Sequence, residues 1–238
     1  MELEDDYEDI IKKSGRGLNK KISGDEDISE IAKRLDLNAA ALKKIKDGKY
    51  KPKFFDYERI YEGLKVINVK CEFYGGYVNA YLVSDEEDNC FVVDTAQSPE
   101  KIIKEIKDKK LNPKFILITH GHGDHVYGKE KIAEEFEIEV YSEKNSEDNQ
   151  ELKFGKRKIK VIKTQGHSED SVTFSVGKFL FVGDLIFAGS LGMANYSYKE
   201  LLKSANKILK FPDNYFIFPG HGPVTTVKEE KEHNAFIV

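Results

Sequence analysis

One short stretch of the chain concentrates side chains that bind metal ions. Residues 119–125 read Thr-His-Gly-His-Gly-Asp-His, so three histidines and one aspartate fall within six positions. Imidazole and carboxylate groups are the usual protein ligands of zinc, and they also serve iron and manganese. A purely structural role would require several desolvated imidazoles to pack side by side. The stretch therefore indicates a metal site, whose bound water would be a nucleophile near neutral pH.

Further candidate ligands occur in glycine-rich turns later in the chain. His167 lies in a Gly-His-Ser turn, and His221 lies in the turn Pro-Gly-His-Gly-Pro. Asp184 follows a glycine at the end of an apolar run. The sixth histidine, His233, lies outside every such turn, and we interpret it as structural or exposed.

Each of these groups follows a segment that is predicted to be a buried strand. The apolar runs are 115–118, 159–162, 179–182 and 215–218. A strand fixes the direction of the chain, and glycine permits the sharp turn that brings a short side chain to a common point. The repeated order of strand, turn and candidate ligand predicts that the groups meet at one edge of the fold.

The order of these motifs resembles the metallo-β-lactamase fold superfamily. His-x-His-x-Asp-His is followed by Gly-His, then Gly-Asp, then Gly-His, and the likeness covers about residues 63–238. Within the superfamily the chain is most similar to the short glyoxalase II-like hydrolases, which the closing pattern Thr226, Glu230, Asn234 also favours. The resemblance implies an α/β fold, an αββα sandwich with the site along one edge.

The resemblance also implies two divalent metal ions, with zinc as the expected metal and iron or manganese as alternatives. Carried over onto this sequence, three histidines hold the first ion, three further residues hold the second, and one aspartate bridges them. These sets are His120, His122 and His167; then Asp124, His125 and His221; then Asp184. Asp124 is also the candidate catalytic residue, which steers or accepts a proton.

Asp94 ends the predicted strand 90–94, at the place of an aspartate that supports the metal loop in the family. An ordinary turn residue is the alternative interpretation at this position. Other predicted elements are strands at 66–69 and 79–83, a hairpin at 172–182, and helices at 98–110, 128–136, 198–209 and near the C-terminus.

The implied activity is attack of a metal-activated hydroxide on a thioester or a related activated ester of a small-molecule substrate. A β-lactamase is disfavoured, because that class usually has cysteine in the place of Asp184. A diiron oxygen reductase is disfavoured, because it carries glutamate in the place of His122. Short relatives often have arginine where this chain has Met193, so the thiol carrier is open.

Two alternatives remain open at this point. A mononuclear-iron persulfide dioxygenase shares the fold and keeps most of these motif residues, but it would use only His120, His167 and Asp184. The other alternative is a DNA-binding regulator in which the metallohydrolase domain acts as a sensor. The second alternative depends on the N-terminal region.

Residues 1–62 are predicted to form a small all-α domain, separate from the hydrolase domain at 63–238. Two short amphipathic helices, at about 28–35 and 39–46, have the outline of a helix-turn-helix. Residues 33–53 carry eight basic and two acidic side chains, a net charge of +6 that suits phosphate. The second helix begins Ala-Ala-Ala, without base-reading side chains. DNA binding and self-association through this domain are both open.

The whole chain has 238 residues, with 38 Lys and Arg against 42 Asp and Glu, a net charge of −4 that argues against general nucleic-acid binding. No apolar run approaches the roughly 18 residues that a membrane span needs. The acidic N-terminus does not resemble a signal peptide, so a cytoplasmic location is expected. Cys71 and Cys90, the two cysteines, are expected to pack as small apolar residues.

Overall fold

The computed structural model describes residues 63–73 and 76–237. The predicted helical domain at 1–62, with its helix-turn-helix outline, lies outside the described residues. DNA binding and self-association, the two roles left open for this domain, depend on the same residues. Among the described residues, no helix combines the length and the apolar character that crossing a membrane requires.

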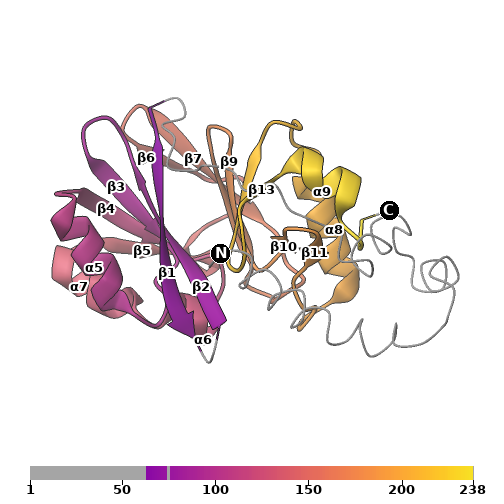
Figure 1. The fold of residues 1–238 in the computed structure, drawn as a ribbon, viewed down its shortest axis with the longest axis horizontal. Coiled ribbons are helices and arrows are strands. Elements are labelled where there is room, and N and C mark those ends of the chain that lie inside the picture. The colour runs from indigo at the N-terminus through magenta and orange to yellow at the C-terminus, as the bar shows by residue number, and fades with distance from the viewer. Residues whose placement is uncertain (1–62, 74–75, 238) are drawn as a thin grey trace, which may run out of the picture.

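Five strands form the first sheet, in the order β1-β2-β3-β4-β5 (Figure 1). Their bounds are Lys65–Phe73 for β1, Gly76–Ser84 for β2, Asn89–Val93 for β3, Asn112–Leu117 for β4 and Glu139–Tyr141 for β5. Strands β1 to β3 pair antiparallel, whereas β3, β4 and β5 pair in parallel. Parallel neighbours require a crossover connection, and the helices α5 (Pro99–Asp108) and α7 (Lys129–Phe136) supply it.

The apolar sides of both crossover helices cover the outer face of the first sheet. Ile102 and Ile106 of α5 and Ile132 of α7 are buried in one cluster with the strand residue Ile116. The two isoleucines of α5 are four residues apart and therefore lie on the same side of the helix. Both predicted amphipathic helices are confirmed.

Six strands form the second sheet, in the order β13-β12-β9-β8-β7-β6. Their bounds are Glu151–Phe154 for β6, Arg157–Lys163 for β7, Val172–Val176 for β8, Phe179–Gly183 for β9, Phe216–Pro219 for β12 and Thr225–Thr226 for β13. The predicted hairpin is β8 and β9, joined by residues 177–178. Gly177 has a φ of 55°, a left-handed conformation that favours glycine at this tight turn.

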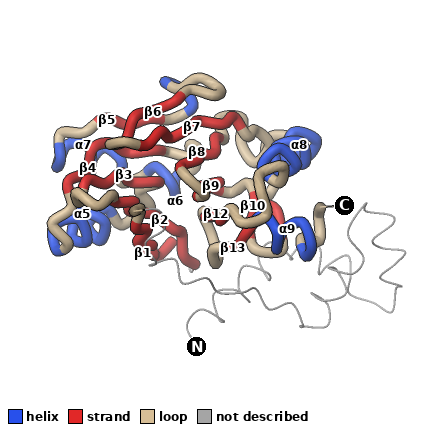
Figure 2. Tube along the Cα trace, turned by 90° about the horizontal axis from the view of Figure 1, so that it is seen from above, coloured by secondary structure: helices blue, strands red, loops and turns tan. Residues whose placement is uncertain are grey.

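Helices α8 (Tyr198–Ile208) and α9 (Val227–His233) cover the outer face of the second sheet (Figure 2). Leu201, Ala205 and Ile208 of α8 and Val227 of α9 share a buried cluster with Leu180 of the sheet. Between β9 and α8 a short hairpin of β10 (Ile186–Phe187) and β11 (Ser190–Leu191) joins this layer. This hairpin was not among the elements predicted from the sequence.

The inner faces of the two sheets meet in one apolar core. Phe181 and Phe218 of the second sheet stack with ring centroids 4.9 Å apart, and Phe91 of the first sheet meets Phe181 edge-on. Tyr81 of β2 packs against Phe181 and Phe218, and its hydroxyl donates to the carbonyl of Pro219 at 2.7 Å. The layers therefore run helix, sheet, sheet, helix, which confirms the predicted αββα sandwich.

Both cysteines are unavailable for chemistry in the folded chain. Cys71 and Cys90 are fully buried free thiols, and burial raises the pKa of Cys90 to about 12. We predict that neither thiol reacts with a chromogenic disulfide reagent at about pH 8 in the native protein, because reaction needs an accessible thiolate. Both should react after unfolding in urea, which serves as the control. Rapid labelling of a native thiol would contradict the described packing.

Candidate metal centre

All seven predicted ligands lie just beyond the ends of β4, β7, β9 and β12. Strands β7, β9 and β12 run in the same direction, so their final residues share one edge of the second sheet. The end of β4 in the first sheet joins this edge, because Val172 donates to the carbonyl of Thr119 at 2.8 Å. The predicted order of strand, turn and candidate ligand is therefore observed at each of the four positions.

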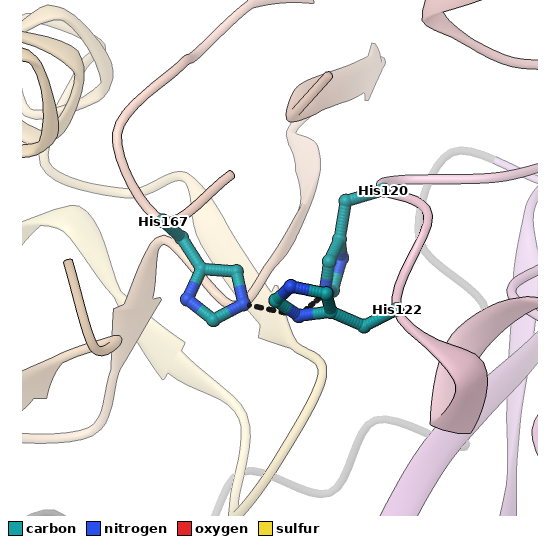
Figure 3. A group of neighbouring side chains, drawn as sticks. All are labelled: His120, His122 and His167. Atoms are coloured by element: carbon teal, nitrogen blue, oxygen red, sulfur yellow. Dashed lines mark hydrogen bonds between the residues drawn. The ribbon is translucent and has the colours of Figure 1, made fainter. Parts of the chain in front are cut away.

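The first group consists of His120, His122 and His167, whose rings point toward one another (Figure 3). Nδ1 of His122 lies 3.1 Å from Nε2 of His120 and 2.9 Å from Nε2 of His167. Burial lowers the pKa of His167 and holds the pKa of His120 well below its ordinary value. Both rings are therefore neutral, and a neutral imidazole offers the lone pair that a metal ion requires.

The second group consists of Asp124, His125 and His221, with donor atoms close enough to share an ion. Oδ2 of Asp124 lies 3.3 Å from Nε2 of His221 and 3.7 Å from Nε2 of His125. Asp124 and His125 belong to the short helix α6 (Gly123–Val126), which begins immediately after His122. The start of this helix therefore divides the motif, since His120 and His122 before it belong to the first group, whereas Asp124 and His125 within it belong to the second.

Asp184 lies between the two groups. Its Oδ2 is 3.7 Å from Nε2 of His167 and 3.5 Å from Nε2 of His221, and its Oδ1 is 3.3 Å from Nε2 of His125. Burial disfavours the charged carboxylate, but His221 and His125 outweigh that effect and hold the pKa of Asp184 well below its usual range. An ionised carboxylate facing both groups is the arrangement that a bridging ligand needs.

Two buried atoms at this point have no hydrogen-bond partner among the described residues: Nε2 of His125 and Oδ1 of Asp184. Most buried polar atoms in proteins are hydrogen-bonded, so two unpaired atoms of metal-ligand type at one point indicate a cation site. Burial lowers the pKa of His125, yet the carboxylates of Asp184 and Asp94 raise it well above its ordinary value. The surroundings are thus strongly negative, and the donor set fits divalent metal ions.

Asp94 holds the metal loop from outside, which is the first of the two interpretations that the sequence left open. Its Oδ1 accepts from the backbone N–H of Thr119 at 2.8 Å, and its Oδ2 accepts from the Thr119 hydroxyl and from Nδ1 of His125, both at 2.8 Å. An ionised carboxylate can only accept, so His125 donates through Nδ1 and presents Nε2 to the centre. Asp94 therefore sets both the position and the tautomer of this ring.

Backbone carbonyls fix two further histidines in the same way. Nδ1 of His167 donates to the carbonyl of Met193 at 2.7 Å, and Nδ1 of His221 donates to the carbonyl of Tyr77 at 2.7 Å. Both rings then present Nε2 to the centre. The sequence did not reveal these partners, because every residue has a carbonyl and the side chain gives no signal of its use.

Asn79 is a supporting residue that the sequence analysis missed. Its side-chain amide donates to the carbonyls of Pro219 and Gly222, at 3.0 and 2.9 Å, and so grips the turn on both sides of His221. A polar side chain within the apolar strand β2 was the available signal, because a buried amide needs hydrogen-bond partners. His233, by contrast, lies on α9 near Glu229, 3.8 Å away, and takes no part in the centre.

The model of the metallo-beta-lactamase superfamily matches residues 73–152 and 143–221, which together are more than half of the chain. The chain belongs to the metallo-β-lactamase superfamily. Among its relatives in this superfamily, the probable metallo-hydrolase YqgX of Bacillus subtilis is 30% identical over 195 residues, covering 67% of this chain and 92% of that protein.

Other superfamily members are similar in sequence or in fold. Hydroxyacylglutathione hydrolase GloC of Haemophilus influenzae is 27% identical over 195 residues, with coverage of 67% and 92%. The structure of the BLEG-1 B3 metallo-beta-lactamase gives a TM-score of 0.68 at 26% identity, covering 73% of this chain and 99% of that chain. TTHA1623 in a di-iron-bound form gives 0.65 at 29% identity, covering 72% and 100%. These relationships identify the chain as a superfamily enzyme.

Replacing Asp94 should weaken metal binding without disturbing the backbone. Asp94 has a φ of 57°, and asparagine tolerates this left-handed conformation as well as aspartate does. We predict that Asp94→Asn binds one of two zinc ions about 10- to 100-fold more weakly, because the His125 ring loses its acceptor. Competition with a chromogenic chelator measures this affinity.

The matched control is Asp88→Asn, because Asp88 has a φ of 58° at an exposed turn away from the centre. This control should bind zinc as the unmodified chain does. Unchanged zinc affinity in Asp94→Asn would show that Asp94 does not support the centre.

Proposed function

We propose that the chain is a binuclear metal-dependent hydrolase that cleaves a thioester or a related activated ester of a small molecule. The observation that carries this proposal is the pair of donor groups that share the Asp184 carboxylate. His120, His122 and His167 would hold one divalent ion, and Asp124, His125 and His221 would hold the other. Zinc is the proposed metal, with iron or manganese as alternatives; TTHA1623, a relative by structure, has a di-iron-bound form.

Two divalent ions at these residues would supply a water with a pKa near neutrality and would polarise the substrate carbonyl. Attack by water on the carbonyl carbon breaks the carbon–sulfur bond and yields a carboxylic acid and a thiol. Asp124 is the proposed proton carrier. Its side chain is 15% exposed, and hydrogen bonding to His221 helps to lower its pKa despite burial, so it is ionised and can accept a proton from water.

Exposed apolar side chains near the ligands are proposed to contact the substrate. Tyr127, Met193 and Tyr196 are 66%, 73% and 50% exposed, so none of them serves to fill the core. Tyr127 lies two residues after His125, and the backbone N–H of Tyr196 donates to the carbonyl of Gly166, beside His167. Exposed apolar groups of this size are typical of binding surfaces.

The similarity to hydroxyacylglutathione hydrolase GloC supports a thioester as the substrate class. Met193 stands where short relatives often have arginine, which favours a thiol carrier other than glutathione. The mononuclear-iron persulfide dioxygenase would use only His120, His167 and Asp184 but keeps most of the other motif residues, and it usually has the arginine that is replaced by Met193 here. The number of metal ions per chain distinguishes the two functions. The regulator alternative depends on residues 1–62, outside the described residues.

Removing one ligand from the first group, or the shared carboxylate, should abolish turnover. We predict that His122→Ala and Asp184→Asn each lower kcat/KM for a thioester by more than about 100-fold. Loss of a residue that only hydrogen-bonds to a metal ligand costs up to about 100-fold, and loss of the ligand itself should cost more. Thiol release, followed with a chromogenic thiol reagent, measures the rate.

His233→Ala is the matched control for this experiment, because it removes a histidine outside the centre and should leave turnover unchanged. Chelation should abolish turnover of the unmodified chain, and added zinc should restore it. If thioester turnover survives in both ligand variants, the binuclear mechanism is wrong.

A further inference from the structure

A buried carboxyl group lies in the second sheet's outer layer, apart from the metal ligands. Glu230 of α9 is fully buried, and both of its oxygens accept hydrogen bonds. Oε1 accepts from the Thr225 hydroxyl at 2.6 Å, whereas Oε2 accepts from the backbone N–H of Gly189 at 2.9 Å and from the Asn234 amide at 2.7 Å. Burial raises the pKa of Glu230 to about 7, against the effect of these three donors. Burial of a carboxyl group costs free energy unless its oxygens are hydrogen-bonded, so the groups that Glu230 contacts indicate its role in the fold.

The contact of Oε2 is with the tip of the β10–β11 hairpin. Gly189 occupies that tip with a φ of 77°, a left-handed conformation that favours glycine. Asn234 strengthens the same attachment, since its amide also donates to the carbonyl of Ser190 at 2.9 Å. Glu230 and Asn234 together fix the hairpin to the end of α9.

Both ends of this hairpin reach the metal centre. The hairpin segment begins directly after Asp184 and leads into Met193, whose carbonyl accepts from Nδ1 of His167 at 2.7 Å. At the base of the hairpin, the N–H of Gly192 donates to the carbonyl of Leu185. The two chain segments approach so closely there that a Cβ atom on Gly192 would lie 1.7 Å from the carbonyl oxygen of Asp184. A displacement of the tip would therefore be transmitted to the base and to Met193.

We propose that Glu230 is a positioning residue of the metal centre, which acts through the β10–β11 hairpin. It fixes the Met193 carbonyl, and that carbonyl holds the His167 ring with Nδ1–H outward and Nε2 toward His122. The inference rests on the proposed function to the extent that it takes His167 as a ligand of the first metal ion.

The two donor groups should depend on Glu230 to different degrees. His167 receives its outer hydrogen bond from the segment that follows the hairpin. The second group takes its outer hydrogen bonds from the first sheet instead, because Asp94 binds His125 and the Tyr77 carbonyl binds His221. The hairpin meets this group through an edge-on ring contact between Phe187 and His221, with centroids 5.9 Å apart, and such a contact does not set the tautomer of an imidazole. Asp184 follows directly after Gly183, the last residue of β9. The carbonyl of Gly183 accepts from the N–H of Gly220 at 2.9 Å, which fixes the end of the strand. Loss of Glu230 should therefore weaken the first ion and spare the second.

The test is titration of the metal-free full chain with cobalt(II), followed by visible absorption. In Glu230→Leu, the side chain keeps a similar volume but has no accepting oxygen, so the Gly189 N–H loses its partner and the hairpin loses this attachment. We expect one cobalt equivalent to bind at least about tenfold more weakly and the other to bind as in the unmodified chain. The exchangeable Nδ1–H signal of His167, shifted by bound cobalt in the proton NMR spectrum, should broaden as solvent reaches it.

Two further variants separate positioning from a loss of stability. Asn234→Leu removes the second attachment of the hairpin and should reproduce the selective loss even if Glu230→Leu fails to fold. Thr225→Val conserves volume and removes only the bond to Oε1, which does not contact the hairpin. This control should lower the thermal unfolding midpoint and leave both cobalt affinities unchanged.

The proposal is overturned if Glu230→Leu and Asn234→Leu lower the unfolding midpoint as Thr225→Val does, with both cobalt affinities unchanged. It is also overturned if both equivalents weaken equally, because the effect would then not pass through His167. Binding of a single cobalt equivalent by the unmodified chain would instead contradict the binuclear function. In that case a tenfold weakening of this equivalent, with the change in the His167 signal, would still support the role of Glu230.

Discussion

The buried carboxylate of Asp184 is the group on which the rest of the centre depends. An ionised carboxylate removed from water is stable only beside opposite charge or hydrogen-bond donors, and imidazole nitrogens of His125 and His221 lie 3.3 and 3.5 Å from its oxygens. The two donor groups on either side of Asp184 would bring divalent ions to the same place. Each loop around Asp184 can therefore be understood by the ligand that it presents and by the contact that keeps the loop in place.

These contacts cross between the two sheets. Asn79 and Tyr81 of the first sheet both donate to the carbonyl of Pro219 in the second, and Asn79 thereby fixes the turn that carries His221. Asp94, also from the first sheet, fixes the loop that carries His125. The hairpin after Asp184 performs the same task for His167 from within the second layer. A rigid sandwich thus places ligands that lie as much as a hundred residues apart in sequence.

Much of this arrangement could be predicted from the sequence. Strands with strong apolar runs and helices with a clear apolar side were found, and the order of His120, Asp184 and His221 indicated both the superfamily and the shared edge. The strands β5 and β6 were missed because they are short and polar. The role of Met193 was missed because it acts through its backbone, and that of Glu230 because its partners become neighbours only in the folded hairpin.

The central claim is that two metal ions share one carboxylate. The most direct test is elemental analysis of metal content per chain, on protein purified without added metal or chelator. We predict about two equivalents of zinc, iron or manganese per chain, one for each donor group. About one equivalent, all of it iron, would contradict a binuclear hydrolase and would support the mononuclear persulfide dioxygenase instead.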